Sequence, residues 1–181
     1  TQARENAPWY QHEEIGYNYR MSNVIAGVVR GQFPYLEEHI AQKKAIYERY
    51  KEGFKDLPVE MNPFEEDKAV PNYWLSCILI KPEAMCKQVR GESEVLYISE
   101  AGKSCPTEIL DAIAELNAEG RPIWKPMHAQ PIYRDHAFVT CEGDGRAEEN
   151  IVNVGMDIFH RGLCLPSDNK MTEEQQDMII E

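Results

Sequence analysis

The chain has 181 residues, of which 43% are hydrophobic and 28% charged, and its formal net charge at pH 7 is −12. These proportions are typical of one folded domain or of one piece of a larger protein. Such an acidic surface repels nucleic acid and anionic lipid, and even the longest apolar runs, such as Cys77–Ile80, are far too short to cross a bilayer. We therefore expect no nucleic-acid partner, no membrane partner and a cytoplasmic location.

Cysteine, histidine and the first residue add three expectations. The five cysteines are scattered without a CxxC pair, which indicates reduced thiols rather than disulfides. The five histidines show no HxH or HxxxH spacing, so we expect no metal site. The chain begins at Thr1 in a polar stretch without an initiator methionine or a signal peptide, which favours a fragment or a processed product.

The N-terminal third predicts an arm followed by two helices. Residues 1–20 are polar and aromatic with little periodicity, so we expect an extended arm. Ser22 is a good N-cap, and the apolar residues after it predict a helix to about Phe33, where Pro34 breaks it. Apolar residues at helical spacing predict a second, amphipathic helix over 35–54.

The middle of the chain is more varied. Residues 57–68 are rich in turn formers and acidic residues, whereas the aromatic and β-branched run 72–80 predicts the strongest strand. Residues 85–103 have the character of an insertion without a clear pattern, in which 95–98 fits a short strand. A proline near its first turn then opens a helix over 106–118.

The last third alternates short elements. In chain order the sequence predicts a strand over 121–123, a proline-kinked loop over 125–133, a turn at Gly143–Gly145, a short helix ending at Arg161, a strand over 163–165, and a helix opened by a capping box from Thr172 to Gln175. Because helices alternate with short strands along the whole chain, the predicted fold class is α/β or α+β.

Two aromatic residues, an amide and a guanidinium stand directly before the first predicted helix, as Tyr17, Asn18, Tyr19 and Arg20. The N-terminus of a helix attracts anions because its first N–H groups have no partner within the helix. Asn18 and Arg20 therefore fit a phosphate or a carboxylate. The alternative is a helix-entry loop with a surface arginine and two packing tyrosines, and the residues alone leave both open.

A second polar cluster surrounds His128. Arg121, Trp124 and Lys125 precede it, and two cations with an indole suit an anion pocket. Since a strand sends alternate side chains to opposite faces, we expect only one of Arg121 and Lys125 to join His128. A single histidine is also common as a structural residue, so that alternative stays open.

Three segments, His12–Asn23, Arg121–Pro131 and Arg161–Gln175, follow one another in a recognisable order. Together they resemble the DegT/DnrJ/StrS family of pyridoxal-phosphate-dependent aminotransferases, which act on nucleotide-linked sugars. The resemblance covers almost the whole chain and is weakest over residues 83–104. It implies the C-terminal small domain (21–181) of a fold-type-I aminotransferase, with helices packed on a short sheet and preceded by an arm (1–20).

The resemblance also implies roles for five residues. Asn18 matches the asparagine that binds the cofactor phosphate of the partner subunit, with Arg20 beside it, so the active site would be shared in a homodimer. Tyr17, Lys125 and His128 match positions at the sugar-nucleotide site. The implied reaction transfers an amino group, expected to come from glutamate, to a keto sugar nucleotide for cell-surface polysaccharide or glycan biosynthesis.

The family's Schiff-base lysine lies upstream of the arm and has no counterpart in this chain, so the resemblance implies that the chain alone is inactive. The lysines of the second predicted helix are expected to face solvent: Lys43, Lys44, Lys51 and Lys55. Two alternatives remain. One is a non-catalytic binding or oligomerisation module that kept this half of the fold. The other is a pyridoxal-phosphate-dependent sugar dehydratase, since a few relatives carry histidine in place of the lysine.

Overall fold

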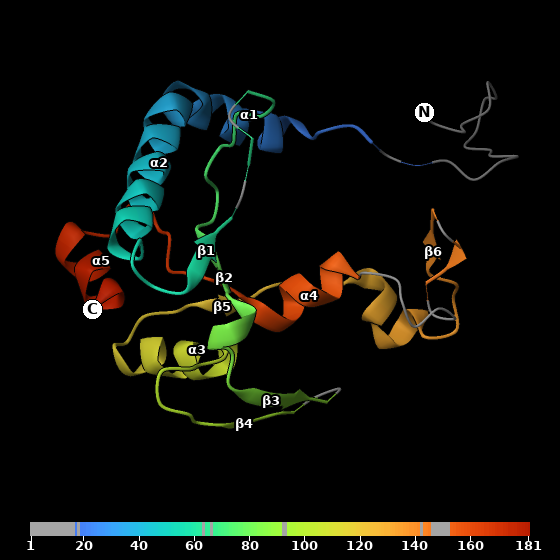
Figure 1. Cartoon of the computed structure of the whole chain (residues 1–181). Helices are drawn as coiled ribbons and strands as arrows, with labels where there is room; N and C mark the ends of the chain where they lie inside the picture. The colour runs from blue at the N-terminus through green and yellow to red at the C-terminus, as the bar shows by residue number, and fades with distance from the viewer. Residues whose placement is uncertain are drawn as a thin grey trace, which may run out of the picture. The chain divides into compact units, whose positions relative to one another are not determined.

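The computed structural model in Figure 1 describes residues 17, 19–62, 64–65, 67–91, 94–141, 143–145 and 153–181. Expectations for other residues, including the placement of Asn18 and most of the arm, lie outside this part. The chain divides into two compact units, Thr1–Glu38 and His39–Glu181, and each is described by itself. No helix of the described part combines the length and the apolar character needed to cross a membrane.

The first unit contains the helix expected after Ser22. Helix α1 spans Asn23–Gln32, and the Ser22 side chain accepts a hydrogen bond from the Ile25 N–H at 3.2 Å, so the predicted N-cap is confirmed. Pro34 lies in the short 3-10 helix η1 (Phe33–Tyr35) that follows. No residue of α1 is buried, so its valines and isoleucine are exposed in this chain.

A four-stranded antiparallel sheet organises the second unit, in the order β1-β2-β8-β5. Its strands are β1 (Val59–Met61), β2 (Cys77–Ile80), β8 (Gly162–Cys164) and β5 (Arg121–Pro122). Strand β8 comes from near the end of the sequence and pairs on both of its sides, so it lies inside the sheet. Helices together with a small sheet confirm the predicted class, α+β.

The core lies where three helices meet this sheet: α2 (Leu36–Gly53), α3 (Pro106–Glu115) and α5 (Glu173–Ile180). The buried cluster consists of Ile46, Tyr50, Phe54, Ile78, Ile113, Leu163 and Leu165. The helices predicted over 35–54 and 106–118 are confirmed. Helix α3 ends earlier than predicted because Asn117, just after it, takes a left-handed φ of 56° that closes the helix.

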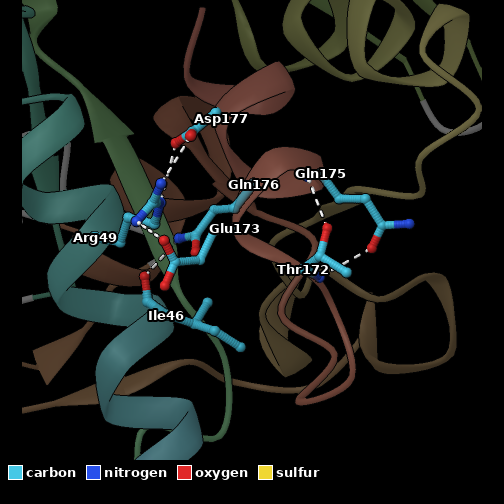
Figure 2. Close-up of polar contacts among 7 residues, drawn as sticks. All are labelled: Ile46, Arg49, Thr172, Glu173, Gln175, Gln176 and Asp177. Carbon is cyan, nitrogen blue, oxygen red and sulfur yellow. Dashed lines mark hydrogen bonds and ion pairs between the residues drawn. The ribbon is translucent and has the colours of Figure 1, made fainter.

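Polar contacts hold α5 on α2, as Figure 2 shows. The Arg49 guanidinium donates to Asp177 from Nε at 3.0 Å and from Nη2 at 2.7 Å, and to Glu173 from Nη1 at 3.0 Å. The hydrogen bond with Arg49 lowers the pKa of Asp177. Beside this pair, the buried Gln176 donates from Nε2 to the Ile46 carbonyl at 2.7 Å. A planar bidentate pair therefore fixes the orientation of α5 as well as its distance from α2.

The capping box predicted at the start of α5 is present. The Thr172 hydroxyl accepts from the Gln175 N–H at 3.2 Å, and the Gln175 side-chain oxygen accepts from the Thr172 N–H at 3.0 Å (Figure 2). Both donors would otherwise lack partners at the helix start, so the local sequence alone sets this terminus.

The strand predicted over 72–80 is wrong in its first half, because β2 contains only its last four residues. Before β2, the Asn72 side chain accepts a hydrogen bond from the Trp74 N–H at 3.1 Å, and Tyr73 has a left-handed φ of 54°. This turn bends the chain out of the extended conformation. The aromatic and β-branched composition of the segment does not reveal it.

The turn predicted at Gly143–Gly145 is also wrong. Strand β7 (Gly143–Asp144) pairs with β6 (Val139–Thr140), so the chain reverses before Gly143. Residues 57–68, predicted as turns, contain strand β1. Strand β7 is two residues long and strand β1 is three, and such short strands are not revealed by the composition of the sequence.

The insertion over 85–103 contains a hairpin. Strand β3 (Lys87–Arg90) pairs with β4 (Val95–Ile98), which confirms the short strand predicted there. The short helix α4 (Val154–Arg161) ends where the sequence predicts, and β8 follows it directly.

Tyr50 joins α2 to the chain that follows β8. Its ring is fully buried, and its hydroxyl donates to the Pro166 carbonyl at 2.8 Å. Burial raises the pKa of Tyr50 well above the usual value of 10.0, because the charged phenolate is disfavoured in apolar surroundings. The hydroxyl is therefore a neutral donor at any ordinary pH.

We expect Tyr50→Phe to lower the free energy of unfolding by about 1–2 kcal/mol, because the Pro166 carbonyl loses its donor. Urea unfolding of the 181-residue chain near neutral pH measures this. Tyr19→Phe, at an exposed ring, is the control and should leave the stability unchanged. An equal midpoint for both variants and the wild type would contradict the role of this hydrogen bond.

The same variant should change the alkaline limb of the stability curve. With the pKa of Tyr50 raised in the folded state, the folded chain binds more protons than the unfolded chain above about pH 10. The free energy of unfolding of the wild type therefore falls as the pH rises above 10. Tyr50→Phe lacks this contribution, so its disadvantage should shrink there.

Candidate functional site

The described part of the arm leads straight into the N-terminus of α1. The rings of Tyr17 and Tyr19 stack with centroids 5.7 Å apart and planes at 29°. Both rings are exposed, as is Arg20. The tyrosines therefore pack on each other and are not core residues of this chain. Arg20 stands two residues before the Ser22 cap, next to the positive end of the α1 dipole.

The proline-kinked loop over 125–133 is formed as predicted. It contains two 3-10 turns, η3 (Met127–Ala129) and η4 (Pro131–Tyr133). Gln130 donates from Nε2 to the Lys125 carbonyl at 3.1 Å, which ties the two sides of the first turn together. Lys125 and His128 are both half-buried, and they lie in the second unit, whereas Tyr17 and Arg20 lie in the first.

Residues from outside the loop hold the His128 ring on two sides. Asn153 Nδ2 lies 2.8 Å from His128 Nε2, and the Phe138 ring stacks on the imidazole with centroids 3.9 Å apart. Asn153 is also the N-cap of α4, where its Oδ1 accepts from the Met156 N–H at 3.1 Å. The sequence motifs do not point to Asn153; the preference of asparagine for N-cap positions is the signal that could have found it.

The hairpin β3–β4 holds the other end of α4. Arg90 donates from Nη1 to the Phe159 carbonyl, and its Cζ lies 4.7 Å above the Phe159 ring. Gln88 donates from Nε2 to the His160 carbonyl at 2.8 Å. The last carbonyls of a helix have no partner within it, and a cation near them is favourable. The weakly matched segment 83–104 therefore contributes a cap for α4.

Arg161 ties α4 to the sheet. It donates from Nη1 to the Ile80 carbonyl of β2 at 2.7 Å, and from Nε to Asp157, one turn back, at 2.7 Å. The hydrogen bond with Arg161 lowers the pKa of Asp157, although partial burial opposes it. The pair keeps the guanidinium aimed at the strand.

A cavity of about 900 Å³ is lined mainly by residues before β2, after α3 and after β8. Trp74 and Trp124 lie in its wall, with ring centroids 6.0 Å apart and exposed fractions of 63% and 61%. Arg121 also lines it, with its Nη2 paired to Glu119 at 2.9 Å. His128 is not among the described residues that line it. Arg121 and Trp124 thus belong to this cavity rather than to the surroundings of His128.

One lysine of α2 does not face solvent as expected. Lys43 is half-buried and donates from Nζ to the Ser167 carbonyl, because the chain after β8 passes beside α2. The helical periodicity of α2 contains no information on that segment. Lys44, Lys51 and Lys55 are exposed, as predicted.

Known proteins with similar sequences and structures identify the family to which this fold and these motifs belong. Residues 2–181 match the DegT/DnrJ/EryC1/StrS aminotransferase family, and the chain belongs to this family. EpsN of Bacillus subtilis (strain 168), which carries the name of a pyridoxal phosphate-dependent aminotransferase, is 37% identical over 182 residues, covering 100% of this chain and 40% of EpsN. The GDP-perosamine synthase of Escherichia coli O157:H7 is 25% identical, covering 95% of this chain and 38% of that protein.

A solved structure supports the same fold. Spr1654 of Streptococcus pneumoniae in its PLP-form, named as a sugar aminotransferase, matches with a TM-score of 0.71 at 16% identity, over 99% of this chain and 39% of that chain. The chain spans about two fifths of the length of the relatives that it matches. The family resemblance of the three sequence segments is therefore confirmed.

We expect Arg90→Met to loosen the last turn of α4, because the Phe159 carbonyl and ring lose the guanidinium. Amide hydrogen exchange in that turn should quicken by about tenfold, or about 1.4 kcal/mol of local opening free energy. Lys87→Met is the matched control, since this exposed cation lies on the same strand, β3. Similar exchange in the two variants would contradict the capping role.

Proposed function

We propose that this chain is the C-terminal part of a pyridoxal-phosphate-dependent aminotransferase. The enzyme transfers an amino group from glutamate to a keto sugar nucleotide, in the cytoplasm, for cell-surface polysaccharide or glycan biosynthesis. The observation that carries the proposal is the family match over residues 2–181. The names of two relatives support it, one specifying the cofactor and the reaction and the other a GDP-linked product.

In this proposal the active site is shared within a homodimer. Residues 1–20 form the arm that reaches the partner subunit's site, and residues 21–181 form the small domain. Asn18 and Arg20 bind the phosphate of the partner's cofactor. This assignment agrees with the place of Arg20 before the capped start of α1, where a guanidinium and the positive end of a helix dipole coincide.

Tyr17, Lys125 and His128 border the sugar nucleotide in this proposal. A half-buried lysine and a histidine on one proline-bounded loop suit a diphosphate with its attached sugar. The 3-10 turns on either side of Gln130 restrain the backbone of this loop, so less side-chain and loop freedom is lost when the ligand binds.

In this proposal Arg20, whose exposed guanidinium is a donor in the described part of the arm, binds the phosphate end of pyridoxal phosphate. When bound, this cofactor supplies the electron sink of transamination. Arg20 binds the cofactor phosphate and orients the cofactor. No lysine in this chain matches the family's anchoring lysine. The ammonium group of Lys43, for example, already donates a hydrogen bond to the Ser167 carbonyl. The chain alone is therefore inactive, and the anchoring residue belongs to the part of the relatives that this chain does not cover.

The direct test compares the full-length protein of the same reading frame with the 181-residue chain. With glutamate and a panel of keto sugar nucleotides, the full-length protein should form 2-oxoglutarate and an amino sugar nucleotide. The chain alone should form neither, and titration with pyridoxal phosphate should give no stoichiometric visible band that depends on one lysine. A dehydrated sugar product, or a reading frame without the lysine motif, would overturn the aminotransferase proposal in favour of a dehydratase or a binding module.

In the full-length protein, His128→Asn should lower kcat/KM for the sugar nucleotide by about tenfold or more, or about 1.4 kcal/mol. The melting temperature should move little, since His128 is only half-buried. His136→Asn, at an exposed histidine of the same region, is the control for a general loss of imidazole. A lowered melting temperature with normal substrate kinetics would instead make His128 a structural residue.

A further inference from the structure

The two ends of the Asn153 amide have different partners, and this sets its orientation. Asn153 Oδ1 accepts the Met156 N–H at 3.1 Å, as an N-cap must, so the amide nitrogen is the atom that faces His128. An amide nitrogen only donates. At 2.8 Å the imidazole Nε2 must therefore accept, which requires that it carries no proton.

The state of His128 follows from this hydrogen bond. A neutral imidazole has one donor and one acceptor nitrogen, so the proton resides on Nδ1. Protonation of Nε2 would place two donors against each other at 2.8 Å, with loss of the hydrogen bond. The contact thus stabilises one tautomer and disfavours the imidazolium.

Phe138 restricts the ring in the remaining direction. The plane of the Phe138 ring lies at 16° to the plane of the His128 imidazole, and the two ring centroids are 3.9 Å apart. The Gly145 N–H donates to the Phe138 carbonyl at 2.7 Å, and a Cβ on Gly145 would lie 2.6 Å from the Phe138 ring, so the hairpin β6–β7 holds Phe138 closely. Rotation of the His128 ring is limited both by stacking and by the amide.

We propose that Asn153 is a positioning residue for His128. Its amide holds the imidazole in the neutral tautomer with the proton on Nδ1, and fixes the plane in which the ring meets a nucleotide-linked sugar. The inference rests on the proposed function for the identity of that ligand, whereas the tautomer is a property of this chain. A neutral, pre-oriented ring loses less solvation and less rotational freedom than a mobile imidazolium when the ligand binds.

Asn153→Asp separates this role from the helix cap. Aspartate caps a helix about as well as asparagine, so α4 should persist. A carboxylate only accepts hydrogen bonds, so it requires a proton on Nε2. Asn153→Ser is the second variant, because serine also caps the helix but is too short to hold the ring.

Nitrogen-15 NMR of the histidine side chains in the 181-residue chain reads the tautomer directly. Wild-type His128, assigned by loss of its signals in His128→Gln, should show an unprotonated Nε2 and a protonated Nδ1. In Asn153→Asp the Nε2 should become protonated, and in Asn153→Ser the two tautomers should mix. A protonated Nε2 in the wild type, or unchanged spectra in both variants, would overturn the inference.

In the full-length enzyme, Asn153→Asp should raise the KM for the sugar nucleotide by about fivefold or more. The KM for glutamate and the melting temperature should stay near the wild-type values. A merely structural role would lower the melting temperature and leave the tautomer unchanged. If the wild type has no transferase activity but the NMR result holds, the proposed function fails while the positioning of His128 by Asn153 stands.

Discussion

The junction between α4 and β8 is the constraint on which the second unit depends. Gly162 follows the last residue of α4 and is the first residue of β8, with no loop between them. A Cβ at this position would lie 2.6 Å from the Ile158 carbonyl oxygen and 2.7 Å from Ile123 Cγ1, so only glycine fits without a backbone shift. Since β8 is buried and pairs with both β2 and β5, this glycine attaches the helix directly to the inside of the sheet.

That attachment makes α4 a rigid support for the candidate site. Its C-terminal end is held by β8, by Arg161 and by the hairpin β3–β4. Its N-terminal end presents Asn153, whose amide meets His128. The orientation of a ring on a loop thus follows from contacts in the sheet, through the eight residues of one helix. Side chains supported by such elements are held more precisely than those on loops alone.

The contacts that lysine and arginine side chains make explain why the net charge is a weak predictor of an anion-binding site in this chain. A charge of −12 suggests that cations are reserved for an anionic ligand. Several instead hold the fold together: Arg49 binds carboxylates of α5, Arg90 and Arg161 bind backbone carbonyls, and Lys43 binds the chain after β8. Buried or half-buried carbonyls at helix and strand ends need donors as much as a ligand does. Residue type alone does not separate these two uses.

The sequence by itself determined the local elements and the family of this protein. The caps at Ser22 and Thr172, the helices α2 and α3 and the three family motifs depend on residues within a few positions of one another, so periodicity and short patterns reveal them. Only the tertiary structure decided the pairing of β8, the bond from Lys43 to Ser167 and the contact between Asn153 and His128. The last two join residues 124 and 25 positions apart. Such contacts are set by how the elements pack, and no local pattern in the chain encodes them.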